Sequence, residues 1–506
     1  MKACTRSKVR LLSWLSLGLL ALLAGCASTV VDRSLPTQSL LPFSESGESD
    51  PPSRWWTEFG DPGLDQQVEH ALGQNFDLAA ALNRLRAARA VVRREASDLY
   101  PDLDGVISTG STFGPGPTQN RISWGFEAAY QVDLWGEIQS RVDAERFRAE
   151  ATCADYHAVA LSLSAEITRT WYSLIEAQAQ LKLLEEQLET NRKGLKNQQQ
   201  RFATGLSSLA DVRRQEQLVQ STLEQFVVER PRVELLEHQL AVLTGEQPQS
   251  ASYDSGDELP ELPPMPYTGL PSELLMRRPD MRAAYLEVLA ADRDLSSAIS
   301  ARYPRLNLTG SLINSATSSD NLLRDWFLSI GSQLIAPLFD GGQRVAEVDR
   351  ASAVKSQLYN VYGQTMLVAF QEVEDNLALE RYQIQRIERL QKQSELAGEA
   401  ADLLRNRLLI GEVSYLDFLS ATQSYQRLQR DTLSARLDLI LIRIGLYLAI
   451  AGDFDTRPQV VVDPSLEDQL LGELPTDQSD QALPPPDVPR RPLTRLPLDP
   501  VSVIDE

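Results

Sequence analysis

The sequence predicts a mainly α protein with a small β part, built from two structural repeats. No proline occurs between Pro117 and Pro231 or between Pro337 and Pro458, and both stretches are rich in Ala, Leu, Gln, Glu and Arg. These residues favour helices. Segments that alternate apolar and polar residues precede each stretch, and one eleven-residue pattern occurs twice, 206 positions apart.

The first 25 residues read as a targeting segment. Residues 1–10 carry four basic side chains and no acid, and the apolar run that follows is too short to span a bilayer comfortably. The run ends in Leu-Ala-Gly-Cys26, which is similar to a bacterial lipobox. That resemblance implies cleavage before Cys26, acylation of its thiol, for example by palmitate, and a lipid-anchored segment over residues 26–61. No Asp follows Cys26, so the analogy implies the outer membrane. An ordinary signal peptide with a chance cysteine is the alternative.

The charge balance argues against nucleic acid as a partner. Lys and Arg total 49 against 70 Asp and Glu, which gives a formal charge of -21 and leaves no basic face. Cys4 leaves with the targeting segment and Cys26 is assigned to lipid. Cys153 therefore remains alone, so we expect no disulfide framework and interpret Cys153 as a packed small residue.

Two long helices are expected, from about Gly136 to Thr204 and from about Gly341 to Asn406. At 1.5 Å per residue, each would be about 100 Å long. Shorter helices are predicted over about 62–100, 208–244, 272–303 and 414–450, and Pro231 should kink or end the second of these. An apolar stripe in the first long helix has the three-, four- and seven-residue steps of a coiled coil: Leu163, Ile167, Trp171, Leu174, Leu181, Leu184 and Leu188.

The repeated eleven-residue pattern predicts two tight helical hairpins. Each copy reads Arg, then Gly four residues later, then Ser and Asp at further steps of three. The Gly suits the left-handed position that ends a helix. The Ser suits the N-cap of the next helix, and the Asp completes a capping box. The copies hold Arg201, Gly205, Ser208 and Asp211, and Arg407, Gly411, Ser414 and Asp417.

Four strands are predicted, two in each half. Residues 100–103 (YPDL) and 303–306 (YPRL) lie 203 positions apart, and a strand, a turn-rich loop and a second strand follow each. The fourth strand is expected near Trp326 to Ile335. The second strand alternates clearly. Its apolar face, which we interpret as lipid-facing, holds Ile122, Trp124, Phe126, Ala128, Tyr130 and Val132.

Four strands with one apolar face cannot close a barrel, and open strand edges are not tolerated in lipid. Strands must therefore be shared between chains. Two chains would give eight strands and an interior that side chains fill, whereas three would give twelve strands and room for a pore.

Six segments together resemble one family. They are WWTEFGDPGLDQQVEHAL (55–72), YQVDLWGEI (130–138), TGLSSLADVRRQEQ (204–217), LPSELLMRRPDMRAA (270–284), YPRLNLTGS (303–311) and GEVSYLDFLSATQSY (411–425). The chain resembles TolC-like outer-membrane efflux proteins of the OprM-type (NodT-type) lipoprotein branch, over about residues 55–452. It departs from the family pattern at Tyr285, where Glu is frequent, and after the last helix, where a Gly-rich segment is common.

The resemblance implies a homotrimer in outer-membrane lipid, with a twelve-strand β-barrel continued by a twelve-helix periplasmic α-barrel. It implies that a periplasmic adaptor and an inner-membrane pump, of the RND type, complete the assembly. The adaptor would contact the hairpin tips through Arg201, Gly205, Ser208, Arg407, Gly411 and Ser414. The family often has a Leu and an Asp at its periplasmic gate. Here Leu416 matches the Leu, Ser420 stands at the Asp position, and Asp417 could substitute for it.

The expected organisation is a first repeat over 62–245, a Pro-rich linker over 246–271, a second repeat over 272–452 and a Pro-rich tail over 453–506. We expect neither enzyme activity nor a cofactor, because the three histidines lie on predicted helices without metal-ligand spacing. Two alternatives to an efflux channel remain: the outer-membrane duct of a type I protein secretion system, and a lipid-anchored periplasmic coiled-coil scaffold. The amphipathic strands disfavour the scaffold.

Overall fold

The computed structural model describes residues 41–49, 52–113, 115, 119–250, 252–253, 255–256, 258–316, 324–452, 454 and 456. The targeting segment and Cys26 lie outside these residues, as does nearly all of the predicted tail. None of the helices in the described part of the chain has the length and apolar character that a bilayer crossing requires.

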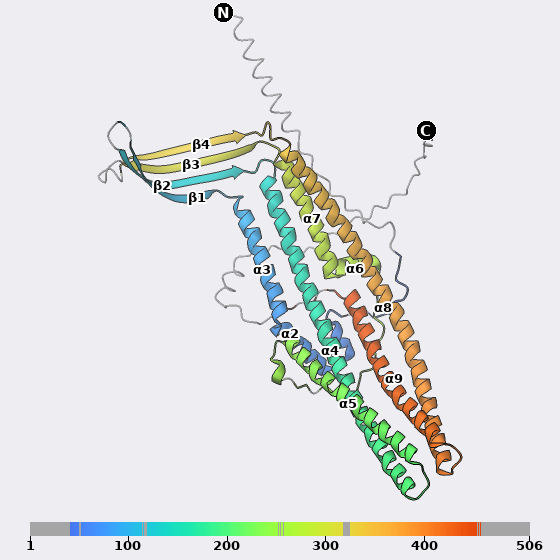
Figure 1. The fold of residues 1–506 in the computed structure, drawn as a ribbon. Helices are drawn as coiled ribbons and strands as arrows, with labels where there is room; N and C mark the ends of the chain where they lie inside the picture. Colours follow the sequence, from blue (N-terminus) through green and yellow to red (C-terminus); the bar gives the residue numbers. More distant parts are fainter. Residues whose placement is uncertain are drawn as a thin grey trace, which may run out of the picture. The chain divides into compact units, whose positions relative to one another are not determined.

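The first half of the chain carries two short helices, a pair of strands, a long helix and a further helix (Figure 1). A 3₁₀ turn, η1, precedes them, and another, η2 (Pro248–Ser250), follows. The elements are η1 (Trp55–Phe59), α2 (Pro62–Gln74), α3 (Phe76–Ser97), β1 (Asp102–Thr112), β2 (Gln119–Val132), α4 (Glu137–Ala203) and α5 (Leu209–Thr244).

The second half repeats this order, which confirms the predicted duplication. The elements are α6 (Pro271–Arg277), α7 (Pro279–Ser300), β3 (Arg305–Ala316), β4 (Trp326–Ile335), α8 (Gln343–Leu409) and α9 (Tyr415–Ile450). Helices α3 and α7 have 22 residues each, α4 and α8 have 67 each, and α5 and α9 have 36 each.

Two predicted helices are each divided in two. The first breaks at Asn75, whose backbone is extended and whose side chain accepts a hydrogen bond from the Leu78 N–H at 3.0 Å. The other breaks at Arg278, because the ring of Pro279 disfavours helical geometry in the residue before it, while proline itself suits the first helical position.

Pro231 was predicted to kink its helix or to end it early. The early end was wrong, because α5 continues to Thr244. Pro231 is exposed, so water can reach the carbonyl group that the missing N–H leaves without a helical partner. The next residue, Arg232, also holds this part of α5 against α4. Its guanidinium pairs with the buried Glu176 at 2.7 Å.

The four strands form one antiparallel sheet in the order β1-β2-β3-β4. Each strand connects to a helix at the same end of the sheet (Figure 1). Within the described residues, β1 pairs only with β2 and β4 pairs only with β3. The sheet therefore has two open edges. Helices α3 and α8 connect to the edge strands β1 and β4, whereas α4 and α7 connect to the central strands β2 and β3.

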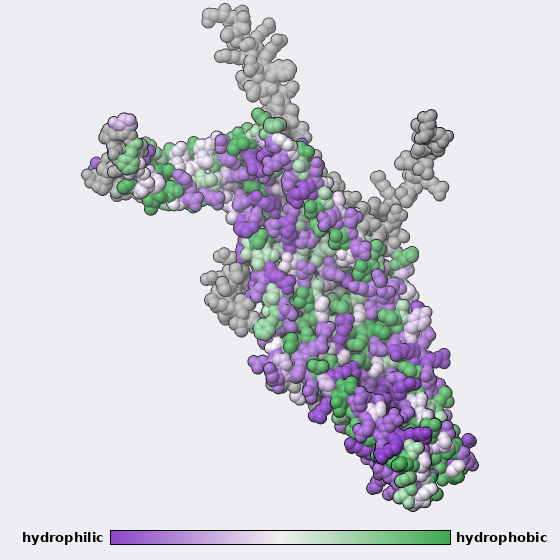
Figure 2. Space-filling view, viewed as in Figure 1, coloured by the Kyte–Doolittle hydropathy of each residue, from purple (hydrophilic) through white to green (hydrophobic). Residues whose placement is uncertain are grey.

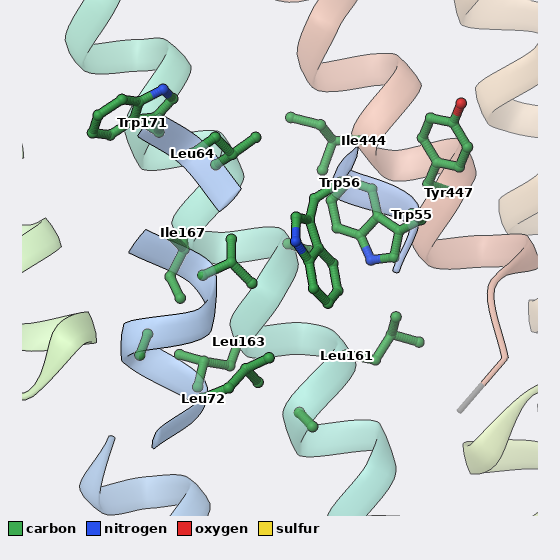
Figure 3. Close-up of a cluster of buried hydrophobic side chains, with 14 of the residues drawn as sticks. Trp55, Trp56, Leu64, Leu72, Leu161, Leu163, Ile167, Trp171, Ile444 and Tyr447 are labelled. Carbon is green, nitrogen blue, oxygen red and sulfur yellow. The ribbon is translucent and has the colours of Figure 1, made fainter. Parts of the chain in front are cut away.

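The main apolar core lies where η1 and α2 pack between α4 and α9; we call it the waist core. Trp55 and Trp56 are fully buried, and the Trp55 ring stacks on Tyr447 with centroids 5.6 Å apart. Figure 3 shows these rings between the two helices. The other large members are Phe59, Leu64, Val68, Leu78, Leu161, Ile167, Trp171, Tyr172, Leu240 and Ile444.

A buried ion pair fastens the linker to the second repeat. Arg443 of α9 and Glu380 of α8 each expose only 2% of their side chains and pair through two guanidinium–carboxylate contacts. Arg443 also donates to the carbonyl oxygens of Pro263 and Pro264 in the linker. Because prolines lack an N–H, the linker pairs little with itself, and Arg443 satisfies two of its carbonyls.

Candidate functional site

The two hairpin tips end their long helices in the same way. Gly205 has φ +74° and Gly411 has φ +81°, both in the left-handed region. The Leu206 N–H donates to the Arg201 carbonyl at 2.8 Å, and the Glu412 N–H donates to the Arg407 carbonyl at 3.0 Å. Together with bonds from each Gly N–H, this is the Schellman pattern, so the glycines stop the helices as expected.

The next helices begin with the predicted serine caps, although the two caps differ. In the first tip, Ser208 Oγ accepts from the Asp211 N–H and Asp211 accepts from the Ser208 N–H, which completes the capping box. In the second tip, Ser414 Oγ accepts from the Asp417 N–H at 3.2 Å. The Ser hydroxyl donates to the Asp carboxylate at 2.6 Å in both tips. The difference is that Asp417 does not accept from the Ser414 N–H, so the capping box predicted for the second tip is incomplete.

Apolar side chains are exposed around both tips. Leu206 exposes 71% of its surface and Ile410 exposes 70%. Figure 2 shows hydrophobic residues at the lower end of the helices, where the hairpins lie. Exposed apolar surface of this kind is typical of a docking site. The other large apolar side chains exposed here are Phe202, Leu209, Leu409 and Leu416.

The candidate gate residues share one exposed face of the first turns of α9. Leu416, Asp417 and Ser420 are all exposed in the single chain. Ser414, the cap of the same helix, engages Asp417. The three residues therefore lie together on one helix, where the Asp417 carboxylate is held by the Ser414 hydroxyl.

A contact between the two hairpins was not anticipated from the sequence. The Tyr415 hydroxyl donates to Gln215 Oε1, and Gln215 Nε2 donates to the Asn191 carbonyl at 2.8 Å. Tyr415 also packs with Leu218 and Leu419. Burial, together with the nearby charge of Asp211, raises the pKa of Tyr415 to about 12, so its hydroxyl stays protonated and able to donate.

Above this contact, α4 and α9 meet through buried polar side chains, which we call the polar seam. Gln187 Nε2 donates to the Gln426 carbonyl and to Gln429 Oε1, both at 3.1 Å, and Arg430 donates to Gln187 Oε1. The signal for the seam was present in the sequence, because its α4 members recur at steps of four and seven. They are Glu176, Gln180, Gln187 and Asn191.

The sheet places the predicted lipid-facing residues on one face. Phe126 lies opposite Leu312, which lies opposite Leu328, so one apolar row crosses three strands. Phe126 is 50% exposed and Ile122 is also exposed. Trp124 and Tyr130 are half-buried. The Trp124 ring meets Trp326 edge to face at 4.8 Å.

Comparison with known proteins identifies the class to which this fold belongs. A family model described as outer membrane efflux protein matches residues 68–246 and 270–452. The outer-membrane channel OprN superimposes with a TM-score of 0.78 at 27% identity, over 84% of this chain and 99% of that chain. The fold with its two hairpin tips and amphipathic sheet is that of a TolC-like outer-membrane channel.

Curated relatives agree over most of their length. The pyoverdine export outer membrane protein OpmQ of Pseudomonas aeruginosa is 28% identical over 465 residues, which is 87% of this chain and 96% of that protein. The toluene efflux pump outer membrane protein TtgI of Pseudomonas putida is 30% identical, over 78% of this chain and 86% of that protein. The chain belongs to the outer membrane efflux protein family, whose members are transport channels, and it is an efflux channel of the bacterial outer membrane.

Proposed function

We propose that three copies of this chain form one exit duct, with a twelve-strand barrel in the outer membrane and a twelve-helix tunnel in the periplasm. The observation that carries this proposal is the four-stranded sheet with two open edges and one apolar face. Unpaired backbone groups are costly in lipid, so the β1 edge of one copy must pair with the β4 edge of the next. Three copies supply twelve strands, which is enough for a pore.

The apolar face would contact lipid, and Cys26 would carry the lipid anchor. Ile122, Trp124, Phe126 and Tyr130 share that face, and a charge near the bilayer midplane costs about 2–4 kcal/mol on the lipid side of a barrel. Phe126→Arg should therefore reduce the amount of assembled oligomer, whereas Glu127→Arg, on the other face, should be milder. Equal losses would contradict the face assignment. Fatty-acid labelling that Cys26→Ser abolishes would support the anchor.

The tips are proposed to bind a periplasmic adaptor that connects the channel to an inner-membrane pump of the RND type. Support comes from the equal geometry of the two Schellman turns and from the exposed apolar side chains around them. Arg201, Gly205 and Ser208 define one tip, and Arg407, Gly411 and Ser414 define the other. The periplasmic opening would be narrowed by Leu416, Asp417 and Ser420, which lie next to the second tip.

The cargo is proposed to be selected by the pump. Relatives of similar identity are named for very different cargoes: pyoverdine for OpmQ, cations for CusC of Escherichia coli, and toluene for TtgI. Channels of one fold therefore serve very different compounds, which indicates that the channel itself contributes little to the choice of cargo. We therefore expect this channel to conduct passively whatever its pump delivers.

The test of this function is a deletion of the gene in its native host. The mutant should accumulate a fluorescent dye that the wild type exports, and the cloned gene should restore export. Purified protein should have the mass of three chains. Unchanged dye export combined with the loss of a single protein from the medium would instead indicate the secretion duct.

The adaptor contact is tested at the tip glycines. A β-branched residue at a positive φ is strained by about 1–2 kcal/mol, although neither Gly205 nor Gly411 has a neighbour that an added Cβ would strike. Gly205→Val with Gly411→Val should leave the oligomer in the membrane but weaken cross-linking to the adaptor and dye export. Gly73→Val in α2 is a control, because an added Cβ there also meets nothing and its φ is not positive. Full export by the tip variant would contradict the assignment.

A further inference from the structure

One contact inside the chain joins the first repeat to the second, just below the sheet. The Trp135 ring, which follows β2, lies against Tyr303 with centroids 5.1 Å apart and planes at 31°. Trp135 Nε1 donates to the Pro304 carbonyl at 2.7 Å, and Ser300 Oγ donates to the Trp135 carbonyl at 2.9 Å. The end of one strand pair thus locks onto the start of the next.

Both halves of this contact occur a second time, beside the two edge strands of the sheet. Tyr100 and Pro101 stand 203 positions before Tyr303 and Pro304, and Ser97 stands 203 positions before Ser300. Phe339 follows β4 as Trp135 follows β2, and each precedes a long helix capped by a left-handed Gly. In the single chain, Phe339 is 94% exposed and Tyr100 is 71% exposed.

We propose that Phe339 of one copy packs on Tyr100 of the next copy and reproduces the Trp135–Tyr303 contact across the boundary between chains. This inference rests on the proposed trimer and adds the residues that close it. Leu338, which is 95% exposed, would be covered by the same contact. A second copy that covers both rings would account for their high exposure in the single chain.

An ion pair nearby supports the assignment, because both of its members are replaced together. Inside the chain, Arg148 of α4 pairs with Asp294 of α7. The equivalent positions, 206 residues after Arg148 and 203 residues before Asp294, hold Val354 of α8 and Val91 of α3. Arg148 also pairs with Glu145 of its own helix. Replacing the arginine alone would take from the aspartate its partner across the junction, whereas two valines can pack against each other. This paired change is expected if α8 meets α3 of the next copy as α4 meets α7.

The proposed contact also explains why assembly closes into a ring. Each internal junction turns the chain by a fixed angle, and each junction between copies would turn it by a similar angle. A head-to-tail interface with a constant rotation forms a closed ring when the rotation divides a full turn. Six similar junctions, three internal and three between copies, would complete the ring.

Cross-linking tests the contact. In a Cys153→Ser background, the pair Tyr100→Cys and Phe339→Cys should react with a short bifunctional thiol reagent in purified outer membranes. We expect covalent dimers and trimers on a denaturing gel. The matched pair Trp135→Cys and Tyr303→Cys should react within one chain and give only the mass of a single chain. Each cysteine alone should give no covalent oligomer.

An alanine cycle covers the case in which the cysteine variants assemble poorly. Tyr100→Ala and Phe339→Ala should each lower the temperature at which the oligomer dissociates, and the double variant should lower it no further than the larger single effect. Fully additive losses would overturn the contact. An intact oligomer without cross-links, in membranes where the matched pair reacts, would also overturn it while leaving the proposed trimer in place. A wild-type chain that is monomeric in the membrane would contradict both the contact and the trimer.

Discussion

The waist core and the polar seam lie along the same helix, α4, but the first is made of apolar rings and the second of polar side chains. At the waist, α4 meets α9 and η1 through Trp55, Trp56 and Tyr447, with aromatic rings 5–6 Å apart. Lower down, α4 meets α9 through buried amides such as Gln187 and Asn191 of α4, which both bond to Gln426 of α9.

This difference separates two tasks. Apolar packing is strong but tolerates small slips between helices, because it depends little on direction. Buried amides contribute less free energy but require particular partners, and an unpaired amide is costly. The waist core therefore supplies stability, and the polar seam fixes how far along α4 the second hairpin sits. The following predictions test this division, from the largest expected effect to the smallest.

Removing a ring from the waist core should have the largest effect. Trp55→Ala should lower the free energy of unfolding by about 3–5 kcal/mol, because it leaves a cavity among buried rings. Trp55 also donates from Nε1 to Ser164 Oγ at 3.2 Å, a bond that Trp55→Phe would lose while keeping most of the packing. Thermal unfolding of the detergent-solubilised protein would measure both. A phenylalanine variant as unstable as the alanine variant would show that the hydrogen bond dominates.

Breaking the buried ion pair between Arg443 and Glu380 should have the next largest effect on stability. Arg443→Met should cost about 3 kcal/mol, because Glu380 would keep a buried charge with no counterion. Arg443→Met combined with Glu380→Leu should recover much of that loss. The linker should become more sensitive to protease in both variants, since the carbonyls of Pro263 and Pro264 lose their donor. Unchanged proteolysis would mean that Arg443 does not hold the linker.

A seam residue should behave differently from a waist residue. Gln187→Leu should cost about 1–3 kcal/mol, because Arg430 and the Gln426 carbonyl lose their partners. Replacing Arg430 by Leu as well should restore stability but should leave the two hairpins less well aligned. Cysteine cross-linking between α4 and α9 would then give several registers instead of one. A single register in the double variant would contradict a role for the seam in alignment.

Acid should loosen the first tip before the waist. Partial burial acts to raise the pKa of Asp211, but hydrogen bonds from Ser208 and the charge of Arg214 lower it overall from its ordinary value of 3.8. Because the pKa of Asp211 is depressed in the folded state, the ionised carboxylate stabilises the tip fully above pH 3.8, the ordinary pKa. This stabilisation is lost as the pH falls through the lower, folded-state pKa. Amide exchange at the tip should rise in that range. Asp211→Asn should remove the pH dependence, and a profile unchanged by it would exclude this cap.

The sequence allowed the repeats, all four strands, both long helices and the tip glycines to be predicted. These features depend on local signals: helix formers without proline, alternation, and a Gly-x-x-Ser pattern. The sequence also contained the break at Arg278, since Pro279 restricts the residue before it, but helical composition on either side outweighed it. The break at Asn75 was harder to predict, because its side chain also donates to the Leu243 carbonyl, which lies far along the chain.

The features that were missed depend on contacts between distant segments. Pro231 is tolerated because Arg232 anchors α5 to Glu176 of α4, and nothing near Pro231 in sequence indicates this pairing. The attachment of the linker to Arg443 is of the same kind. Of the candidate site, the hairpin geometry could be predicted and the Tyr415–Gln215 contact could not, because that contact joins residues 200 positions apart.

The two tips have nearly the same backbone but are not chemically equal. Tyr415 occupies the position that Leu209 occupies in the first tip, and Tyr415 alone donates to Gln215 of the other hairpin. In the proposed trimer the six tips would therefore form two alternating sets of three. The ring of tips would look six-fold in outline but would have only three-fold symmetry. A binding partner with six identical subunits would have to meet two kinds of site, which allows a hexameric ring to dock as three pairs.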